Sequence, residues 1–262
     1  MKKLAIASAL LSALAITGTA NAYQAEIGAS AAYVDPDNGS SGNAFGVDGT
    51  YYFNPVQTRN APLAEAAYLD RASNVGAYAT FADRGNTDSN TYGANVEVFV
   101  PNSDFYLSGG VSQNERESVN QFGQKNDWDT TYYQAEVGYL PAPGLLIAAG
   151  LKGYDDDNDD GVDPTLRAKY VTTLSNGKDI NLEAGAAFGD LDEYNLAADY
   201  FIDKTLSLGV DYYDNDRNDS NEFGINARKF FTPQVSLEGR VGFGEEGNAD
   251  YNSFGVAAKY RF

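Results

Sequence analysis

The chain has 262 residues with 19 Tyr, 14 Phe and 27 Gly, a formal net charge of −19 at pH 7, and neither Cys nor His. The excess of acids argues against a nucleic-acid partner, because phosphate binding requires an excess of Lys and Arg. A chain without Cys and His has no disulfide, no thiolate or imidazole metal site, and no nucleophile activated by histidine. We therefore expect a protein that is not an enzyme and that carries no metal or cofactor.

The first residues are typical of a secretory signal peptide. Two lysines precede an apolar run from Leu4 to Ile16, and an Ala-Asn-Ala cleavage motif ends at Ala22. The sequence therefore predicts a signal peptide at residues 1–22 and an exported mature domain at residues 23–262.

From residue 23 onward, apolar side chains recur at every second position. This period indicates β-strands with one apolar face and one polar face. We count about 14 such segments of roughly 8 to 12 residues, which is the length of a tilted strand that crosses a bilayer. In chain order, the apolar positions that mark them lie within residues 23–33, 45–53, 75–81, 92–100, 105–111, 133–139, 145–151, 166–170, 180–188, 196–202, 206–212, 223–227, 235–243 and 254–262.

The connections between these segments alternate in length. Short turns follow the even-numbered segments, at residues 101–104, 141–144, 175–179, 203–204 and 232–234. Longer acidic links follow most odd-numbered segments and begin at Asp35, Asp83, Asn114, Tyr154, Asp214 and Glu245. Short periplasmic turns and long outer loops are typical of outer-membrane barrels. Two links differ, because residues 189–193 are short for an outer loop and residues 54–74 are long for a periplasmic turn.

Together these patterns predict an all-β fold, a transmembrane antiparallel up-and-down β-barrel of about 14 strands, with a margin of about two. An even count places both chain ends on the periplasmic side, and the last strand must pair with the first because lipid tolerates no open sheet edge. The alternative is a soluble exported β-sandwich. Aromatic residues at strand ends, such as Tyr33, Phe53 and Tyr139, argue against it, as do the alternating links and the terminal Phe.

The last segment has the sequence FGVAAKYRF. In the predicted barrel, Tyr260 and Phe262 lie in the interfacial aromatic girdle, while Lys259 and Arg261 point inward. A final strand that ends on Phe resembles the assembly signal of Gram-negative outer-membrane barrels. Residues 51–75 are also similar to a segment of the putative-porin family of gamma-proteobacteria. The resemblance covers the mature chain and implies a porin in the outer membrane of a Gram-negative bacterium.

A porin of this kind implies a definite set of partners. We expect outer-membrane lipid and lipopolysaccharide around the barrel, and the barrel-assembly machinery and periplasmic chaperones during its biogenesis. Small hydrophilic solutes would pass through it.

Residues out of phase with the apolar set should face the lumen. They include many Gly, and their acids and bases are nearly balanced, a lining that suits only a water-filled interior. The acids are Glu26, Asp48, Glu97, Glu136, Glu183, Asp199, Asp211 and Glu238, and the bases are Lys152, Arg167, Lys169, Arg228, Arg240, Lys259 and Arg261. A barrel of about 14 strands should leave a narrow open pore. The alternative is that these charges form internal salt bridges that close the lumen.

The basic residues concentrate on the last three predicted strands. Arg228, Arg240, Lys259 and Arg261 lie there, and barrel closure places them across the lumen from the fifth to seventh predicted strands and Glu136. We hypothesise that these four cations, with Glu97 and Glu136 opposite, flank the narrowest part of the pore and set its ion selectivity.

Residues 54–74 form a second candidate site. Pro62 precedes a run that reads as a short helix. The segment is either a lid packed under the barrel or a constriction folded into the lumen. Arg59, Glu65 and Arg71 are its charged candidates, and in the constriction Arg59 and Arg71 would reach the pore.

The acidic run at residues 155–167 invites a calcium-binding interpretation. An EF-hand loop that starts at Asp156 has Arg167 at its twelfth position, where a bidentate Glu is required, and no helices flank it. We expect a solvated outer loop and no metal site.

Two functions remain open at this level. The first is passive diffusion of water, ions and small hydrophilic solutes through the barrel. The second is a structural or surface-interaction barrel whose lumen is closed by internal salt bridges.

Overall fold

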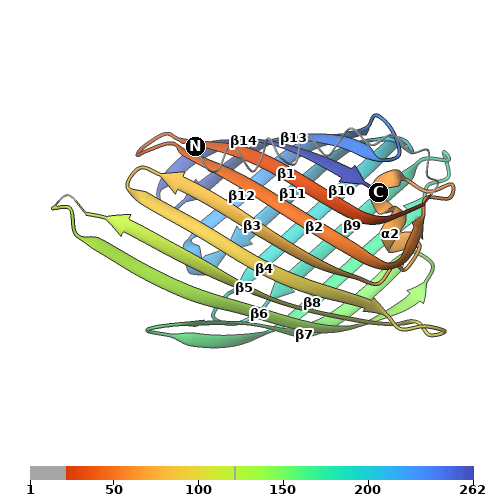
Figure 1. The fold of residues 1–262 in the computed structure, drawn as a ribbon, viewed down its shortest axis with the longest axis horizontal. Helices are drawn as coiled ribbons and strands as arrows, with labels where there is room; N and C mark the ends of the chain where they lie inside the picture. The colour runs from red at the N-terminus through yellow and green to blue at the C-terminus, as the bar shows by residue number, and fades with distance from the viewer. Residues whose placement is uncertain (1–21, 121) are drawn as a thin grey trace.

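The computed structural model describes residues 22–120 and 122–262. Its 14 strands form one closed barrel, in which each strand pairs antiparallel with its neighbours in the sequence and β1 pairs with β14 (Figure 1). The predicted fold class and strand count are confirmed. The predicted signal peptide lies outside the described residues except for Ala22.

The strands are β1 (Ala22–Pro36), β2 (Gly42–Gln57), β3 (Asn74–Arg84), β4 (Thr87–Phe99), β5 (Phe105–Val119), β6 (Lys125–Ala142), β7 (Leu145–Asp156), β8 (Asp160–Thr173), β9 (Asp179–Ala187), β10 (Glu193–Asp203), β11 (Leu206–Asn215), β12 (Ser220–Phe230), β13 (Val235–Glu246) and β14 (Ala249–Arg261). Three short helical elements join them, namely η2 (Leu63–Glu65), α2 (Ala66–Leu69) and η3 (Asp216–Asn218). Helix α2 lies at the end of the barrel where β14 finishes (Figure 1). We call this the periplasmic end, and the opposite end the extracellular end.

The outer links differ from the sequence-based expectation, because most of their residues extend strands. The link expected from Asn114 is largely strand, since β5 runs to Val119 and β6 starts at Lys125. The ladder continues there with Ser118 opposite Asn126. Beyond the bilayer both faces of a strand meet water, so the apolar alternation ends although the backbone hydrogen bonds do not.

The acidic run at 155–167 shows the same effect. Only residues 157–159 separate β7 from β8, and the Asp156 carboxylate accepts hydrogen bonds from the backbone of Asn158 and Asp159. Arg167 lies on β8, where its side chain contacts the lumen carboxylate of Glu136.

The last strand closes the barrel against the first. Glu26 lies opposite Arg261, and the backbone of Phe262 exchanges hydrogen bonds of 2.9 Å with that of Ala25 in both directions. Phe262 is 58% exposed, whereas Tyr260 is only 5% exposed and stacks on the Phe262 ring. Pairing of the last strand with the first is confirmed. Of the two residues expected in the aromatic girdle, only Phe262 has an exposed side chain.

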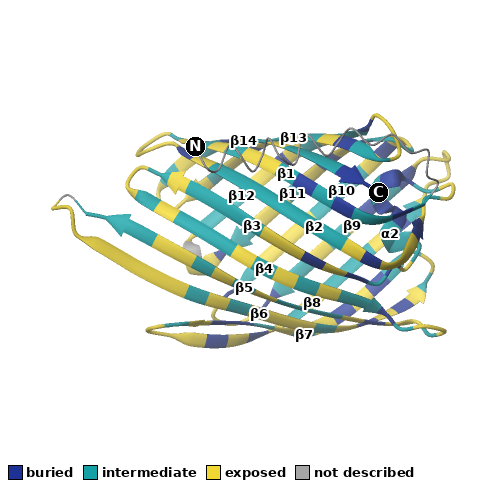
Figure 2. Ribbon diagram, viewed as in Figure 1, coloured by how far each residue is buried: buried dark blue, intermediate teal, exposed yellow. Residues whose placement is uncertain are grey.

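The outer surface is apolar along the length of the strands. Val137, Val256 and Phe105 are all more than half exposed, and Figure 2 shows exposed residues recurring along every strand in view. Large apolar surfaces of this kind mark contact with lipid or a partner, and the closed barrel identifies the partner as the acyl chains. Among the described residues, no helix is long and apolar enough to cross a membrane.

The buried apolar residues gather at the two ends of the barrel. At the periplasmic end, Ala66 and Ala72 pack with Tyr23 of β1 and with Tyr52 and Val56 of β2. A second cluster there joins Phe99, Tyr106, Leu140 and Leu146 to Tyr68 of α2. At the extracellular end, Leu191 packs with Tyr154 and Ala187. Each end therefore holds a chain segment that folds inward.

Candidate functional site

Three cavities lined by the described residues follow one another along the lumen of the barrel. The outer cavity measures about 370 Å³, the middle cavity about 290 Å³ and the inner cavity about 500 Å³. Asn95 lines all three. The outer and middle cavities also share Lys152 and Glu193, and the middle and inner cavities share Glu97 and Arg167. The cavities therefore adjoin one another along a polar lumen.

Residues 58–73 cross the periplasmic end of this path. The backbone N–H of Leu63 donates to Lys204 O of the β10–β11 turn at 2.8 Å, and the Arg261 guanidinium donates to Leu63 O at 2.8 Å. The Tyr68 hydroxyl donates to Gly144 O of the β6–β7 turn at 3.0 Å. The segment leaves β2 and returns to β3, yet it contacts turns and strands on the far wall, so it spans the lumen.

Glu65 is the charged group of this segment that reaches the lumen. It is 5% exposed, and its carboxylate lies 2.8 Å from Lys169 Nζ. Lys169 also contacts Glu183 at 2.6 Å and lies 5.0 Å from the centre of the Tyr68 ring. Burial of a carboxylate is costly unless it is paired, and here the pair joins the segment to β8.

Arg59 and Arg71 do not enter the lumen. Arg59 pairs with Asp70 of the same segment at 3.0 Å and keeps 72% of its side chain exposed. Arg71 pairs with Asp104 of the β4–β5 turn at 3.0 Å. Both form ion pairs at the periplasmic rim, because the helical turn aims Glu65, and not the flanking arginines, at Lys169.

A hydrogen-bonded chain separates the middle cavity from the inner one. Arg167 donates to the Glu136 carboxylate from Nη2 at 2.8 Å and to the Tyr106 hydroxyl at 3.2 Å. Tyr106 in turn donates to Glu97 at 2.6 Å. These four side chains come from β4, β5, β6 and β8, so a single network crosses much of the wall.

A second network lies where β1, β2 and β14 meet. Glu26 is 5% exposed and accepts from Arg261 Nε at 2.5 Å and from Lys259 Nζ at 3.1 Å. Lys259 also lies 3.7 Å from Asp48. The Arg261 guanidinium is 4.6 Å from the centre of the Tyr23 ring, and these contacts hold it away from the open path.

The remaining predicted cations are paired as well. Arg228 Nε lies 2.5 Å from Glu238, and Arg240 forms ion pairs with Asp211 and Glu222. The expected basic wall facing an acidic wall is therefore wrong, because each of these cations meets a carboxylate on a neighbouring strand, and Arg240 also meets one two strands away. Because the two opposite charges of such a pair nearly cancel, the pair contributes little electrostatic field at a distance.

The predicted lumen residues do not all reach the three cavities. Those that line them are Glu26, Glu97, Glu136, Glu183, Asp199, Lys152, Arg167, Lys169, Arg228 and Lys259. The predicted lumen residues that do not line these cavities are Asp48, Asp211, Glu238, Arg240 and Arg261.

The sequence pattern did not identify two carboxylates that pair with lumen cations. Glu222 pairs with Arg240, and Glu193 pairs with Lys152. Both are in phase with predicted inward residues, Glu222 with Arg228 and Glu193 with Asp199. Extending the alternation by a few residues into the expected loops would have found them.

Residues 188–192, between β9 and β10, fold into the extracellular end. The Asp163 carboxylate accepts from the backbone N–H groups of Asp190 at 3.0 Å and Leu191 at 2.5 Å. Leu191 is 1% exposed and lines the outer cavity. Gly189 has φ = 142°, and a Cβ there would lie 2.1 Å from Asp163 Oδ1, so this approach requires glycine. This explains why the link is short for an outer loop.

Comparison with solved structures supports an outer-membrane channel fold. The outer membrane protein Omp33 of Acinetobacter baumannii is 28% identical, with a TM-score of 0.71, and the match covers 92% of this chain and 99% of that one. The TodX deltaS2S3 mutant monoaromatic hydrocarbon channel is 9% identical, with a TM-score of 0.58 and coverage of 92% and 90%. The CymD monoaromatic hydrocarbon channel is also 9% identical, with a TM-score of 0.57 and coverage of 92% and 89%. These two show likeness of fold alone.

No curated protein matches the chain. A family model described as "putative general bacterial porin" matches residues 1–134, which is about half of the sequence. With the closed barrel and the apolar outer surface, this match shows that the chain belongs to the putative general bacterial porin family.

Proposed function

We propose that this porin conducts water, ions and small hydrophilic solutes passively along the three lumen cavities. The observation that carries the proposal is that the three cavities adjoin one another along the lumen, since Asn95 borders all three and charged or amide side chains line each of them. A path of this kind gives a hydrated solute replacement hydrogen bonds, while the apolar outer face keeps the barrel in lipid.

Single-channel recording tests this function directly. The refolded mature chain in a planar bilayer in potassium chloride should give discrete open steps. A folded, heat-modifiable barrel that stays electrically silent would favour the second candidate, a structural or surface-interaction barrel. The paired lumen charges and the segment across the periplasmic end are the observations that support this second candidate.

The lumen charges support a preference for cations. Within the described residues, Glu97 and Asp199 have no ion-pair partner, since Glu97 accepts from Asn74 and Tyr106, and Asp199 accepts from Asn181. Both line the inner cavity. The inner cavity as a whole is lined by five carboxylates and four cations, so its formal charge is negative and favours cations.

Reversal potentials in a salt gradient test this preference. The double variant Glu97→Gln with Asp199→Asn should lower the potassium-to-chloride permeability ratio. Glu117→Gln is the matched control, because Glu117 pairs with Lys125 on the extracellular strand extensions, away from the path. Equal reversal potentials for wild type and the double variant would disprove the assignment.

Residues 58–73 are, in this proposal, a constriction and not a lid beneath the barrel. The contacts of Glu65 with Lys169 and of Leu63 with Lys204 support this choice. Deletion of residues 62–70 should raise the single-channel conductance. Unaltered conductance together with lower stability would identify a lid.

The export and assembly of the barrel are also proposals. Cleavage of the signal peptide after Ala22 predicts a mature protein that starts at Tyr23, which mass spectrometry of the outer-membrane protein would check. The exposed Phe262 side chain at the closing strand supports recognition by periplasmic chaperones and the barrel-assembly machinery. Phe262→Ala should lower the amount of folded barrel in cells but leave refolding in detergent intact. Lipopolysaccharide would contact the extracellular strand extensions.

A further inference from the structure

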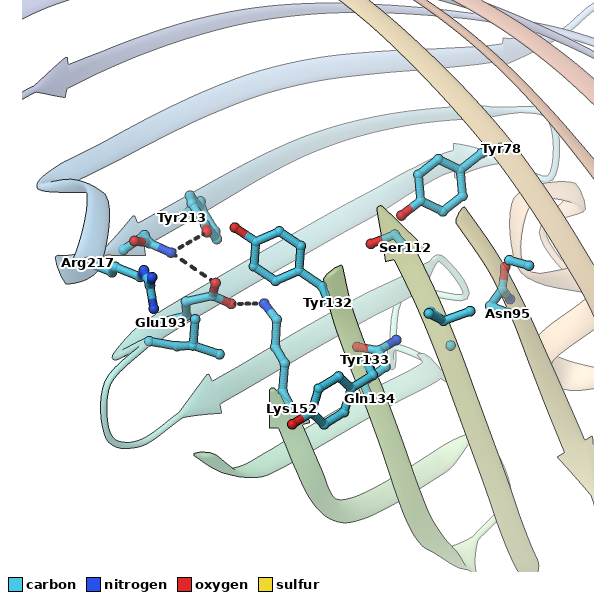
Figure 3. A pocket seen from close by; sticks show the side chains of 15 residues that line it. Tyr78, Asn95, Ser112, Tyr132, Tyr133, Gln134, Lys152, Glu193, Tyr213 and Arg217 are labelled. Carbon is cyan, nitrogen blue, oxygen red and sulfur yellow. Dashed lines mark hydrogen bonds and ion pairs between the residues drawn. The ribbon is translucent and has the colours of Figure 1, made fainter. Parts of the chain in front are cut away.

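The outer cavity differs in chemistry from the two cavities below it. Its wall carries the side chains of Tyr78, Tyr132 and Tyr213, and the amides of Asn95 and Gln134 (Figure 3). The middle and inner cavities contain the ionic networks described above. The volume of about 370 Å³ lies within the ordinary range of small-molecule sites.

Tyr78 is arranged as an aromatic platform. Its ring lies directly over Gly93 of the neighbouring strand, where a Cβ would come within 2.4 Å of the ring atoms Cε1 and Cζ. Glycine at this position lets the ring rest against the backbone of β4. The residue nevertheless remains 40% exposed, and Figure 3 shows its hydroxyl end turned toward the cavity. A ring supported from behind offers its other face to a solute.

Several polar side chains around this ring are free to bind a solute. Within the described residues, no side-chain hydrogen bond forms at Tyr78, Asn95, Ser112, Tyr132 or Gln134, although all five line the cavity. The Tyr213 hydroxyl, by contrast, accepts from Asn215 at 3.0 Å. Amides and hydroxyls can both donate and accept, so this set matches a solute that has many hydroxyl groups.

The formal charges near the cavity are compensated. Lys152 pairs with Glu193, and Arg217 lies 3.6 Å from Asp156 and over the Tyr154 ring. The net charge of −19 also disfavours the approach of anions. The site therefore offers an aromatic face and neutral hydrogen-bonding groups, with no unpaired charge to select an ion.

We propose that the outer cavity is a binding subsite for neutral polyhydroxylated ring solutes, such as a mono- or disaccharide. The C–H face of the sugar ring packs on Tyr78, and its hydroxyls bond to the amides of Asn95 and Gln134 and to the Tyr132 hydroxyl. The inference rests on the proposed channel function for the onward route, because Asn95 and Gln134 also line the middle cavity. Binding at the entrance must be weak enough for release into that cavity.

Saturation-transfer NMR with maltose on the refolded mature barrel in micelles tests binding without requiring conduction. Sorbitol is the matched solute control, since it has the hydroxyls but no rigid ring face. Maltose should give saturation transfer and sorbitol much less. Tyr78→Ala should weaken maltose binding by about 3- to 10-fold, which corresponds to the usual strength of one aromatic contact, while Tyr78→Phe should retain most of it.

Two further variants make the test specific. Gln134→Ala should weaken binding by about 2- to 10-fold through a lost hydrogen bond, and it tests the site even if Tyr78→Ala fails to fold. Tyr251→Ala is the matched control, because Tyr251 also lies over a glycine, Gly244, but does not line the outer cavity. A difference in gel mobility between unheated and heated samples would verify that each variant is folded.

The outcomes separate this inference from the channel function. A conducting barrel without maltose binding, equal transfer to sorbitol, or unchanged binding in Tyr78→Ala would overturn the subsite and leave the channel intact. An electrically silent barrel that still binds maltose in a Tyr78-dependent way would support the subsite and refute conduction. Transfer to a cationic aromatic probe, with none to maltose, would also overturn the choice of a sugar.

Discussion

Replacing Lys169 by Met should release residues 58–73 from the lumen. Lys169 Nζ lies 2.8 Å from Glu65 of this segment and 2.6 Å from Glu183 of β9. Met keeps a similar length and apolar stem but has no charge. The variant therefore leaves two carboxylates close together inside the barrel with no cation between them.

The magnitude follows from burial. Only 15% of the Lys169 side chain and 6% of the Glu65 side chain are exposed, and removal of one partner from a buried pair costs about 3–5 kcal/mol. Glu65 can recover its hydration if the segment moves out. That movement breaks the hydrogen bonds of Leu63 and Tyr68, at about 0.5–1.5 kcal/mol each. The same bonds break when the segment of the wild type moves out, so their cost cancels in the comparison. A difference of about 3 kcal/mol raises the displaced population about 100-fold.

Limited proteolysis reads out this population. Trypsin cuts after Arg71, next to the buried Ala72, and cleavage follows the population of the open form when opening is fast. The variant should be cut there about 100-fold faster while the barrel stays intact, and its single-channel conductance should rise.

Two controls complete the experiment. Lys125→Met removes an exposed pair with Glu117 and should change neither reading. Adding Glu65→Gln to Lys169→Met removes the stranded charge and should restore much of the wild-type protection. If Lys169→Met is cut at the wild-type rate with unchanged conductance, the ion pair does not hold the segment and the reasoning fails.

Three more predictions concern other parts of the path. Gly93→Val should push the Tyr78 ring into the outer cavity and lower the single-channel conductance. Gly239→Val is the control, because a Cβ there meets no atom within 4 Å. Equal conductance of the two variants would contradict the packing of Tyr78 on Gly93. Asp163→Ala should release residues 188–192, because each backbone N–H that loses its acceptor destabilises the folded segment by about 1–3 kcal/mol. Amide hydrogen exchange in this segment should become faster, and unchanged exchange would refute the role of Asp163. Burial raises the pKa of Tyr68 to about 12, so its contribution to stability is complete below about pH 10 and is lost toward pH 12. Between pH 10 and pH 12, the free energy of unfolding measured by denaturant titration should therefore fall less for Tyr68→Phe than for the wild type. An equal fall in both proteins would contradict this role of Tyr68.

The sequence alone was sufficient to predict the barrel. Alternation of side chains is a local property of extended backbone, so Phe254, Val256 and Lys259 could be assigned to faces without knowledge of their neighbours. The even strand count then required closure, which the pairing of Glu26 with Arg261 confirms. The same alternation predicted which charged residues face inward, but not which of them meet.

The partners of those charges depended on the three-dimensional structure. Arg240 meets Asp211 two strands away, and Lys169 meets Glu65 of a segment that returns from the far wall. No spacing in the sequence predicts either contact, because strand tilt and stagger determine the height at which each side chain lies. The basic wall inferred for the last three strands was wrong for this reason.

The inward segments were decided by tertiary structure as well. Residues 58–73 were recognised as unusual in length, yet their sequence is compatible with a surface helix or with a lumen insert. The choice depends on whether Glu65 and Tyr68 find partners on β8 and in the β6–β7 turn. Alternation along a strand is fixed by backbone geometry, whereas contact across a lumen requires groups from distant parts of the chain to meet, and only the folded barrel brings them together.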